Sequence, residues 1–193
     1  MKIAMKLLIV GSAAVIWSCN GQQSKDPTTR ADSTNEEMID SSHAAGAAPA
    51  IAEKDAKFAV DAANGGMAEV QLGEMAQSRG ADSSVKAFGK MMVTDHSKAN
   101  DELKMIAAGK NITLPAAPDN EKQKVATDLS SKSGADFDKA YIKQMVDDHE
   151  KTVKLFEDAQ KDVQDSDLKA FAVKTLPVLR THLEHVKALK KTK

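Results

Sequence analysis

Two short stretches of the sequence repeat a carboxylate–imidazole pair in the same hydrophobic context. Residues 88–96 read FGKMMVTDH and residues 141–149 read YIKQMVDDH, so the aromatic residue, the lysine, the Met-Val pair and the terminal Asp-His pair recur in register. Imidazole nitrogens and carboxylate oxygens are ligands for Zn, Fe, Mn and Cu ions. The repeat therefore predicts two equivalent helices, each with a candidate metal-binding pair.

Helical geometry places these pairs beside the hydrophobic core. An α-helix turns by about 100° per residue, so Asp95 and His96 lie about 50° to either side of the centre of their apolar stripe. Asp148 and His149 occupy the same positions on the second helix. Both pairs are therefore expected to flank the buried seam and not to face solvent.

Two further helical segments carry ionisable residues on their apolar stripes. Glu69 lies near the stripe centre of the first segment, and His182 lies near the centre of the last one, with His185 on its near flank. All four long helices thus direct such a side chain towards the bundle axis. The candidate metal ligands are Glu69, Asp95, His96, Asp148, His149, His182 and His185.

Two interpretations of this set remain open. Burying one unpaired charge costs several kcal/mol, so the side chains must compensate one another. The carboxylates could accept hydrogen bonds from the imidazoles in a purely structural polar layer. Alternatively, the set could bind one or two metal ions, with each aspartate as a ligand or as a support for a ligand. The nearby methionines, which would suit Cu(I), are interpreted as core filling.

Periodicity and capping signals predict five helices and no strand. Two long helices are expected at about 52–79 and 82–109, and a short one at about 119–131 follows a proline-containing crossover. After a break at residues 133–134, a third long helix carries the apolar stripe from Phe137 to Ala159, and a fourth, capped by Asp165 or Ser166, carries the stripe from Leu168 to Leu189. Pro177 should kink or bulge the last helix. The predicted fold is all-α, an up-and-down four-helix bundle with an extra short helix in the middle crossover. The repeat indicates a pseudo-twofold that relates either two helix pairs or the two middle helices alone.

The first residues of the chain predict export and lipid attachment. Lys2 and Lys6 precede an apolar run too short to span a bilayer, and the run ends at Cys19, the single cysteine among 193 residues. This pattern resembles a bacterial lipoprotein signal, with an ordinary signal peptide as the alternative. Residues 1–18 would be removed, leaving lipidated Cys19 on a membrane. Asn20 favours the outer membrane, with the protein facing the periplasm or the cell surface.

Composition separates a tether from a folded domain. Residues 19–51 are rich in small and polar residues and predict a flexible tether, in which His43 has no expected role. Residues 52–193 form the predicted domain. The formal net charge of −1 gives no electrostatic basis for binding nucleic acid. The membrane is the one partner that the sequence indicates, and no protein partner can be named.

The motifs of the folded part resemble a known family. The stretches GGMAEVQLG at residues 65–73, VKAF followed by MVTDH at 85–96, and LPVLRTHL at 176–183 are similar to the bacterial domain-of-unknown-function family 4142, labelled "putative outer membrane protein". The resemblance covers residues 54–189 and implies a ferritin-like fold and an exported protein, without an established activity. Ferritin-like di-iron enzymes carry Glu-x-x-His pairs on two helices, and this chain has Asp-His and His-x-x-His instead.

The sequence therefore supports two main functional hypotheses. The first is a cell-envelope protein that binds a transition metal (Zn, Fe, Mn or Cu) in the bundle core. The second is a non-catalytic envelope stress or interaction module with a purely structural polar core. A metal-dependent oxidase or hydrolase is a third hypothesis, but no nucleophile elbow or phosphate-binding loop supports it, and no catalytic residue is predicted.

Overall fold

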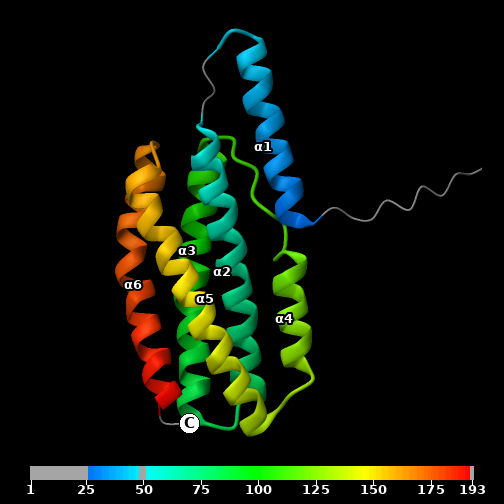
Figure 1. Ribbon diagram of the computed structural model, residues 1–193, viewed down its shortest axis with the longest axis vertical. Helices are drawn as coiled ribbons and strands as arrows, with labels where there is room; N and C mark the ends of the chain where they lie inside the picture. Colours follow the sequence, from blue (N-terminus) through cyan, green and yellow to red (C-terminus); the bar gives the residue numbers. More distant parts are fainter. Residues whose placement is uncertain (1–25, 48–50, 192–193) are drawn as a thin grey trace, which may run out of the picture.

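The structure, a computed structural model, describes residues 26–47 and 51–191, and all of its regular elements are helices (Figure 1). Within those residues the helices are α1 (Pro27–Ala44), α2 (Glu53–Arg79), α3 (Ser83–Gly109), α4 (Asn120–Ser130), α5 (Gly134–Asp162) and α6 (Ser166–Lys191). The predicted all-α bundle is confirmed. The helices α2, α3, α5 and α6 form the bundle, and α4 lies in the crossover between α3 and α5.

Two buried carboxylates tie the helix pairs to each other. Asp55, in the first turn of α2, accepts hydrogen bonds from the backbone N–H groups of residues 164 and 165, at 3.0 and 2.7 Å. Asp138, in the first turns of α5, accepts from the N–H groups of residues 81 and 82, at 3.1 and 2.9 Å. Helices α2 and α5 are therefore antiparallel. The reciprocal contact favours the pseudo-twofold that relates the pair α2–α3 to the pair α5–α6.

The helix boundaries follow the capping signals in the sequence. The carboxylates of Asp82 and Asp119 accept hydrogen bonds from the first turns of α3 and α4, and Asp165 does the same for α6. Helix α2 ends at Gly80 as predicted. Helix α6 continues as one element through Pro177, because the neighbouring turns still pack against the bundle.

A polar layer separates two hydrophobic clusters. One cluster gathers around Phe58, Phe156 and Phe171, and the other around Phe88 and Met145. On each of the four long helices, the stretch between the members of the two clusters carries buried ionisable side chains: Glu69 on α2, His96 on α3, Asp148 and His149 on α5, and His182 on α6. The predicted polar residues are therefore enclosed above and below by apolar side chains. The complete burial of Met145 agrees with its interpretation as core filling.

Helix α1 differs from the prediction of a flexible tether over residues 19–51. The side chain of Asp26 accepts a hydrogen bond from the N–H of Thr28, with Pro27 at the first helical position. Asn35 is buried and exchanges two hydrogen bonds with the backbone of Thr113, at 3.0 and 2.8 Å. This amide clamp holds α1 on the crossover together with the hydrogen bond that the Asn120 N–H donates to Asp26 Oδ2 at 2.7 Å, and not a continuous apolar stripe. The predicted signal peptide and Cys19 lie outside the described residues.

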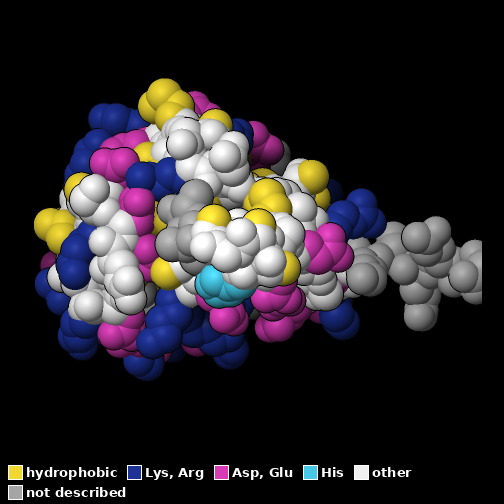
Figure 2. Space-filling model, turned by 90° about the horizontal axis from the view of Figure 1, so that it is seen from above, with side chains coloured by type: hydrophobic (Ala, Val, Ile, Leu, Met, Phe, Trp, Pro, Cys, Tyr) yellow, Lys and Arg dark blue, Asp and Glu magenta, His cyan; other side chains and the backbone are white. Residues whose placement is uncertain are grey.

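The molecular surface carries both signs of charge. Seen from above, the side chains of Lys and Arg lie interspersed with those of Asp and Glu (Figure 2), in keeping with the net charge of −1. Among the described helices, none combines the length and the hydropathy needed to cross a bilayer.

Candidate metal centre

A close crossing of α2 and α3 brings Glu69 and His96 together. A Cβ atom on Gly73 would lie 2.6 Å from the carbonyl oxygen of Gly89, so the two backbones approach more closely than any larger residue would permit. Glu69 lies one turn before this crossing on α2, and His96 lies two turns after it on α3. As a result, Glu69 Oε2 lies 3.1 Å from His96 Nδ1, with both side chains buried.

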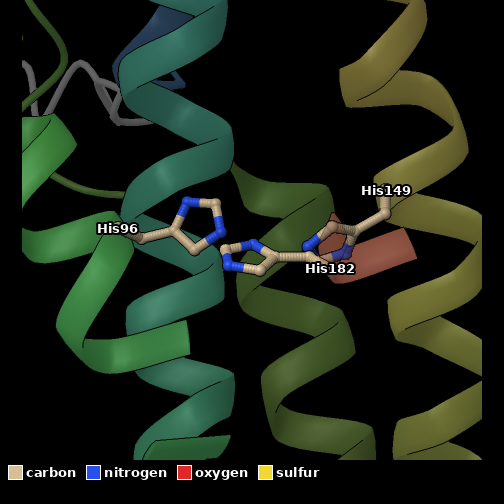
Figure 3. A group of neighbouring side chains, drawn as sticks. All are labelled: His96, His149 and His182. Atoms are coloured by element: carbon tan, nitrogen blue, oxygen red, sulfur yellow. The ribbon is translucent and has the colours of Figure 1, made fainter. Parts of the chain in front are cut away.

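The other helix pair contributes two buried imidazoles. His149 on α5 donates from Nδ1 to the carbonyl oxygen of Met145 at 2.9 Å, and the same nitrogen lies 3.4 Å from Glu69 Oε1. His182 on α6 donates from Nε2 to Asp95 Oδ2 at 2.9 Å. Figure 3 shows these two rings and that of His96 converging between the helices, and one nitrogen from each ring lies within 4.8 Å of the others.

In each of the three rings, one nitrogen has no hydrogen-bond partner among the described residues. His96 Nε2, His149 Nε2 and His182 Nδ1 are buried without a hydrogen-bond partner among the described residues. Neither oxygen of Glu69 makes a hydrogen bond there, although both lie close to ring nitrogens. Buried polar atoms are nearly always paired, and each unpaired one costs about 1–3 kcal/mol. Protein groups among the described residues therefore do not by themselves complete the hydrogen bonds of the layer.

Burial and charge set the protonation of the cluster. Burial raises the pKa of Glu69, but attraction to His96 and His149 in their protonated forms, and to the Lys122 ammonium group, outweighs it, so that the pKa of this carboxyl is lowered and the carboxylate is ionised. Burial lowers the pKa of His96, and it lowers the pKa of His182 to about 4 against the opposing effect of the hydrogen bond that His182 donates to Asp95. Those two rings are neutral near pH 7. An ionised carboxylate beside neutral imidazoles attracts a cation and repels an anion.

Asp95 and Asp148 accept hydrogen bonds from groups outside the cluster or at its edge. Asp95 supports His182 from outside the cluster. Asp148 lies against α4, where it accepts hydrogen bonds from Lys122 Nζ at 2.6 Å and Gln144 Nε2 at 2.9 Å. His185 is exposed and packs its ring against Phe88. The structure thus brings together Glu69, His96, His149 and His182, with Asp95 behind them, and leaves Asp148 and His185 apart.

Two residues near the cluster were not anticipated. The hydroxyl group of Tyr141 is buried and lacks a partner within the described part of the chain, and burial raises its pKa. The repeat offered a signal for it, because tyrosine stands where the first copy has Phe88. Lys122 lies on the short helix α4, and its charge helps to lower the pKa of Glu69. No sequence pattern pairs that lysine with the bundle core.

Comparison with known proteins identifies a family but no characterised relative. A family model described as "Domain of unknown function (DUF4142)" matches residues 40–189. No curated protein and no solved structure matches the chain. The ferritin-like character that the resemblance implied stays a prediction, supported by a bundle with one long crossover.

Proposed function

We propose that this chain, which belongs to the DUF4142 family, binds a transition-metal ion in its bundle core through His96, His149 and His182. The observation that carries the proposal is that three buried imidazole rings, each with one unpartnered nitrogen, converge so that one nitrogen of each ring lies within 4.8 Å of the others. Each of these rings also has its other nitrogen against a protein oxygen, an arrangement that orients histidine ligands in metal sites.

The spacing of the rings allows an ion to bind with small side-chain movements. Ring nitrogens within 4.8 Å of one another must draw together, because a tetrahedral ion with bonds of about 2.0–2.1 Å places its ligands about 3.4 Å apart. Three histidines leave a fourth coordination position for water or a small ligand. The donor set suits Zn, Fe, Mn or Cu ions.

Charge balance supports the same conclusion. A divalent ion would offset the ionised carboxylate of Glu69, which is only 1% exposed. It would also engage the unpartnered nitrogens, so that the desolvation cost of the layer is recovered when the ion binds.

The cellular setting is a separate part of the proposal. The pattern of Lys2, Lys6 and Cys19 supports export and attachment to the outer membrane through a lipid on Cys19. Mass spectrometry of the protein extracted from membranes tests this step. A protein recovered from the soluble fraction, with its first 18 residues intact, would refute it.

Metal content and thermal stability test the metal site. The untagged protein should contain about one equivalent of metal by elemental analysis, and Co²⁺ should give visible absorption bands of an imidazole-bound ion. At a metal concentration of about 1,000 times the dissociation constant, binding stabilises by about 4 kcal/mol. That corresponds to a melting-temperature increase of about 8–16 °C.

Histidine variants provide the control. The triple variant His96→Ala, His149→Ala, His182→Ala should lose the metal and the melting shift, whereas His185→Ala should keep both. If the triple variant does not fold, the single variant His96→Gln supplies the comparison through the Co²⁺ bands. The proposal fails if the wild-type protein binds none of the four metals, or if the variants and the wild type give equal shifts.

A further inference from the structure

A surface pocket between α3 and α6 lies next to the histidine cluster. Its volume is about 140 Å³. Its walls are two helical stripes that face each other across the bundle surface: Asp95, Lys98, Ala99 and Glu102 from α3, and Lys174, Thr175 and Val178 from α6. The pocket therefore opens on the side of the bundle where the polar layer reaches the surface.

Asp95 connects this pocket to the buried cluster. Its side chain is 38% exposed in the pocket wall, and its Oδ2 accepts the hydrogen bond from His182 Nε2 at 2.9 Å. On the other side of the same imidazole ring, His182 Nδ1 is buried and unpartnered. The imidazole ring of His182 thus separates the pocket from the three converging nitrogens.

The charges in the pocket leave one carboxylate available to a cation. Glu102 is engaged by Lys174, whose Nζ lies 2.9 and 2.7 Å from its two oxygens. Asp95 has no lysine or arginine partner in the part of the chain that the structure describes. Its carboxylate therefore offers an approaching metal ion a first oxygen ligand at the surface.

Approach along the bundle axis and approach from the α5 side are both closed. The two hydrophobic clusters cover the layer along the bundle axis. On the α5 side, His149 is completely buried, and Lys122 and Asp148 form an ion pair over the neighbouring surface. The α3–α6 side is where a cluster histidine contacts a solvent-exposed ligand group.

We infer that the α3–α6 pocket is the access port through which a divalent metal ion reaches the buried histidines. The ion is first held by Asp95, and rotation of the His182 ring then passes it inward to the three nitrogens. This inference rests on the proposed metal site. It assigns Asp95 a role in the rate of loading in addition to its positioning of His182.

Blocking the pocket tests the route without altering a ligand. In Val178→Phe, a larger side chain fills the pocket wall, and Val173→Phe is the matched control because Val173 is an exposed valine of the same helix outside the pocket. Loading is followed by the absorption of bound Co²⁺ after mixing, and release by transfer to a chelator. Val178→Phe should slow both rates by about tenfold, a barrier increase of about 1.4 kcal/mol. The equilibrium affinity should be unchanged, because the bound and free end states are the same.

The outcomes separate this inference from the proposed function. If Val178→Phe and Val173→Phe load at the same rate, the port is refuted while the metal site stands. Weaker equilibrium binding by Val178→Phe at an unchanged loading rate also refutes it, since the substitution would then act on the site itself. If the wild-type protein binds no Co²⁺, the proposed function fails, and the inference fails with it. Thr175→Phe, in the same pocket, replaces Val178→Phe should the latter not fold.

Discussion

Replacing Asp148 by asparagine should destabilise the domain and leave its metal stoichiometry intact. The Asp148 carboxylate is 2% exposed and pairs with Lys122 Nζ at 2.6 Å. Without it, the Lys122 ammonium group loses its countercharge. Breaking a buried ion pair on one side costs about 3–5 kcal/mol. The Lys122 side chain is 21% exposed, so water solvates part of its charge and reduces the cost of losing the partner. We expect about 2–4 kcal/mol, or a melting temperature lower by about 5–15 °C.

Urea denaturation in the presence of a chelator measures this effect in the metal-free protein. A double-mutant cycle with Lys122→Met isolates the pair, because removing both charges should recover at least about 1 kcal/mol relative to the sum of the single losses. Elemental analysis then reports whether metal is retained. An Asp148→Asn variant with normal stability and no metal would show that Asp148 is a ligand, contrary to its placement against α4. Strictly additive losses would show that the ion pair contributes nothing.

Three further predictions follow from the hydrogen bonds and charges around the bundle. Asp138→Ala strips the N–H groups of residues 81 and 82 of their acceptor, and should lower the free energy of unfolding by about 2–3 kcal/mol, measured as a lower urea midpoint at an unchanged slope. In the metal-free protein, the pKa of His182 is about 4 in the folded state and 6.5 in the unfolded state. The unfolded state therefore binds the proton first as the pH falls, and the free energy of unfolding should decrease by about 3 kcal/mol between pH 6.5 and 4 and stay constant above pH 6.5. A series of urea midpoints measured in chelator at different pH values tests this. A flat profile over that window would contradict the burial of a neutral ring. Asp95→Asn removes the negative charge of the group that accepts the hydrogen bond from His182, and should weaken metal binding about 10–100-fold in competition titrations. An unchanged affinity would show that Asp95 does not contribute to metal binding.

The helices of the bundle could be predicted because their signals are local. Asp82, Asp119 and Gly80 act through hydrogen bonds or backbone conformation within one turn, so the sequence alone places the helix ends. Helix α1 was missed because its stability depends on Asn35 and Thr113, which are 78 residues apart. Hydrophobic periodicity carries no information about such a clamp. The Asp26-Pro27 start was the local signal that could have indicated the helix.

The site was predictable in its centre and ambiguous at its flanks. Glu69 and His182 lie near the centres of their stripes, where a side chain can face only the core. A residue about 50° from the centre faces either the core or the adjacent helix, and helical geometry cannot decide between them. His149 faces the cluster while Asp148 faces α4, whose position depends on the path of the crossover. His185 is one turn beyond the layer and reaches solvent.

The division of the cluster between the two helix pairs has a consequence for assembly. The pair α2–α3 carries Glu69 and His96, and the pair α5–α6 carries His149 and His182, so each pair holds half of the cluster. The covalent connection between the pairs is the crossover that contains α4. Two chains that exchanged these halves would rebuild two complete clusters with the same contacts, which is the condition for domain swapping. We expect a deletion within residues 113–117 to produce a swapped dimer with two metal sites, detected by size-exclusion chromatography with light scattering. A strictly monomeric, metal-binding deletion variant would show that the halves close only within one chain.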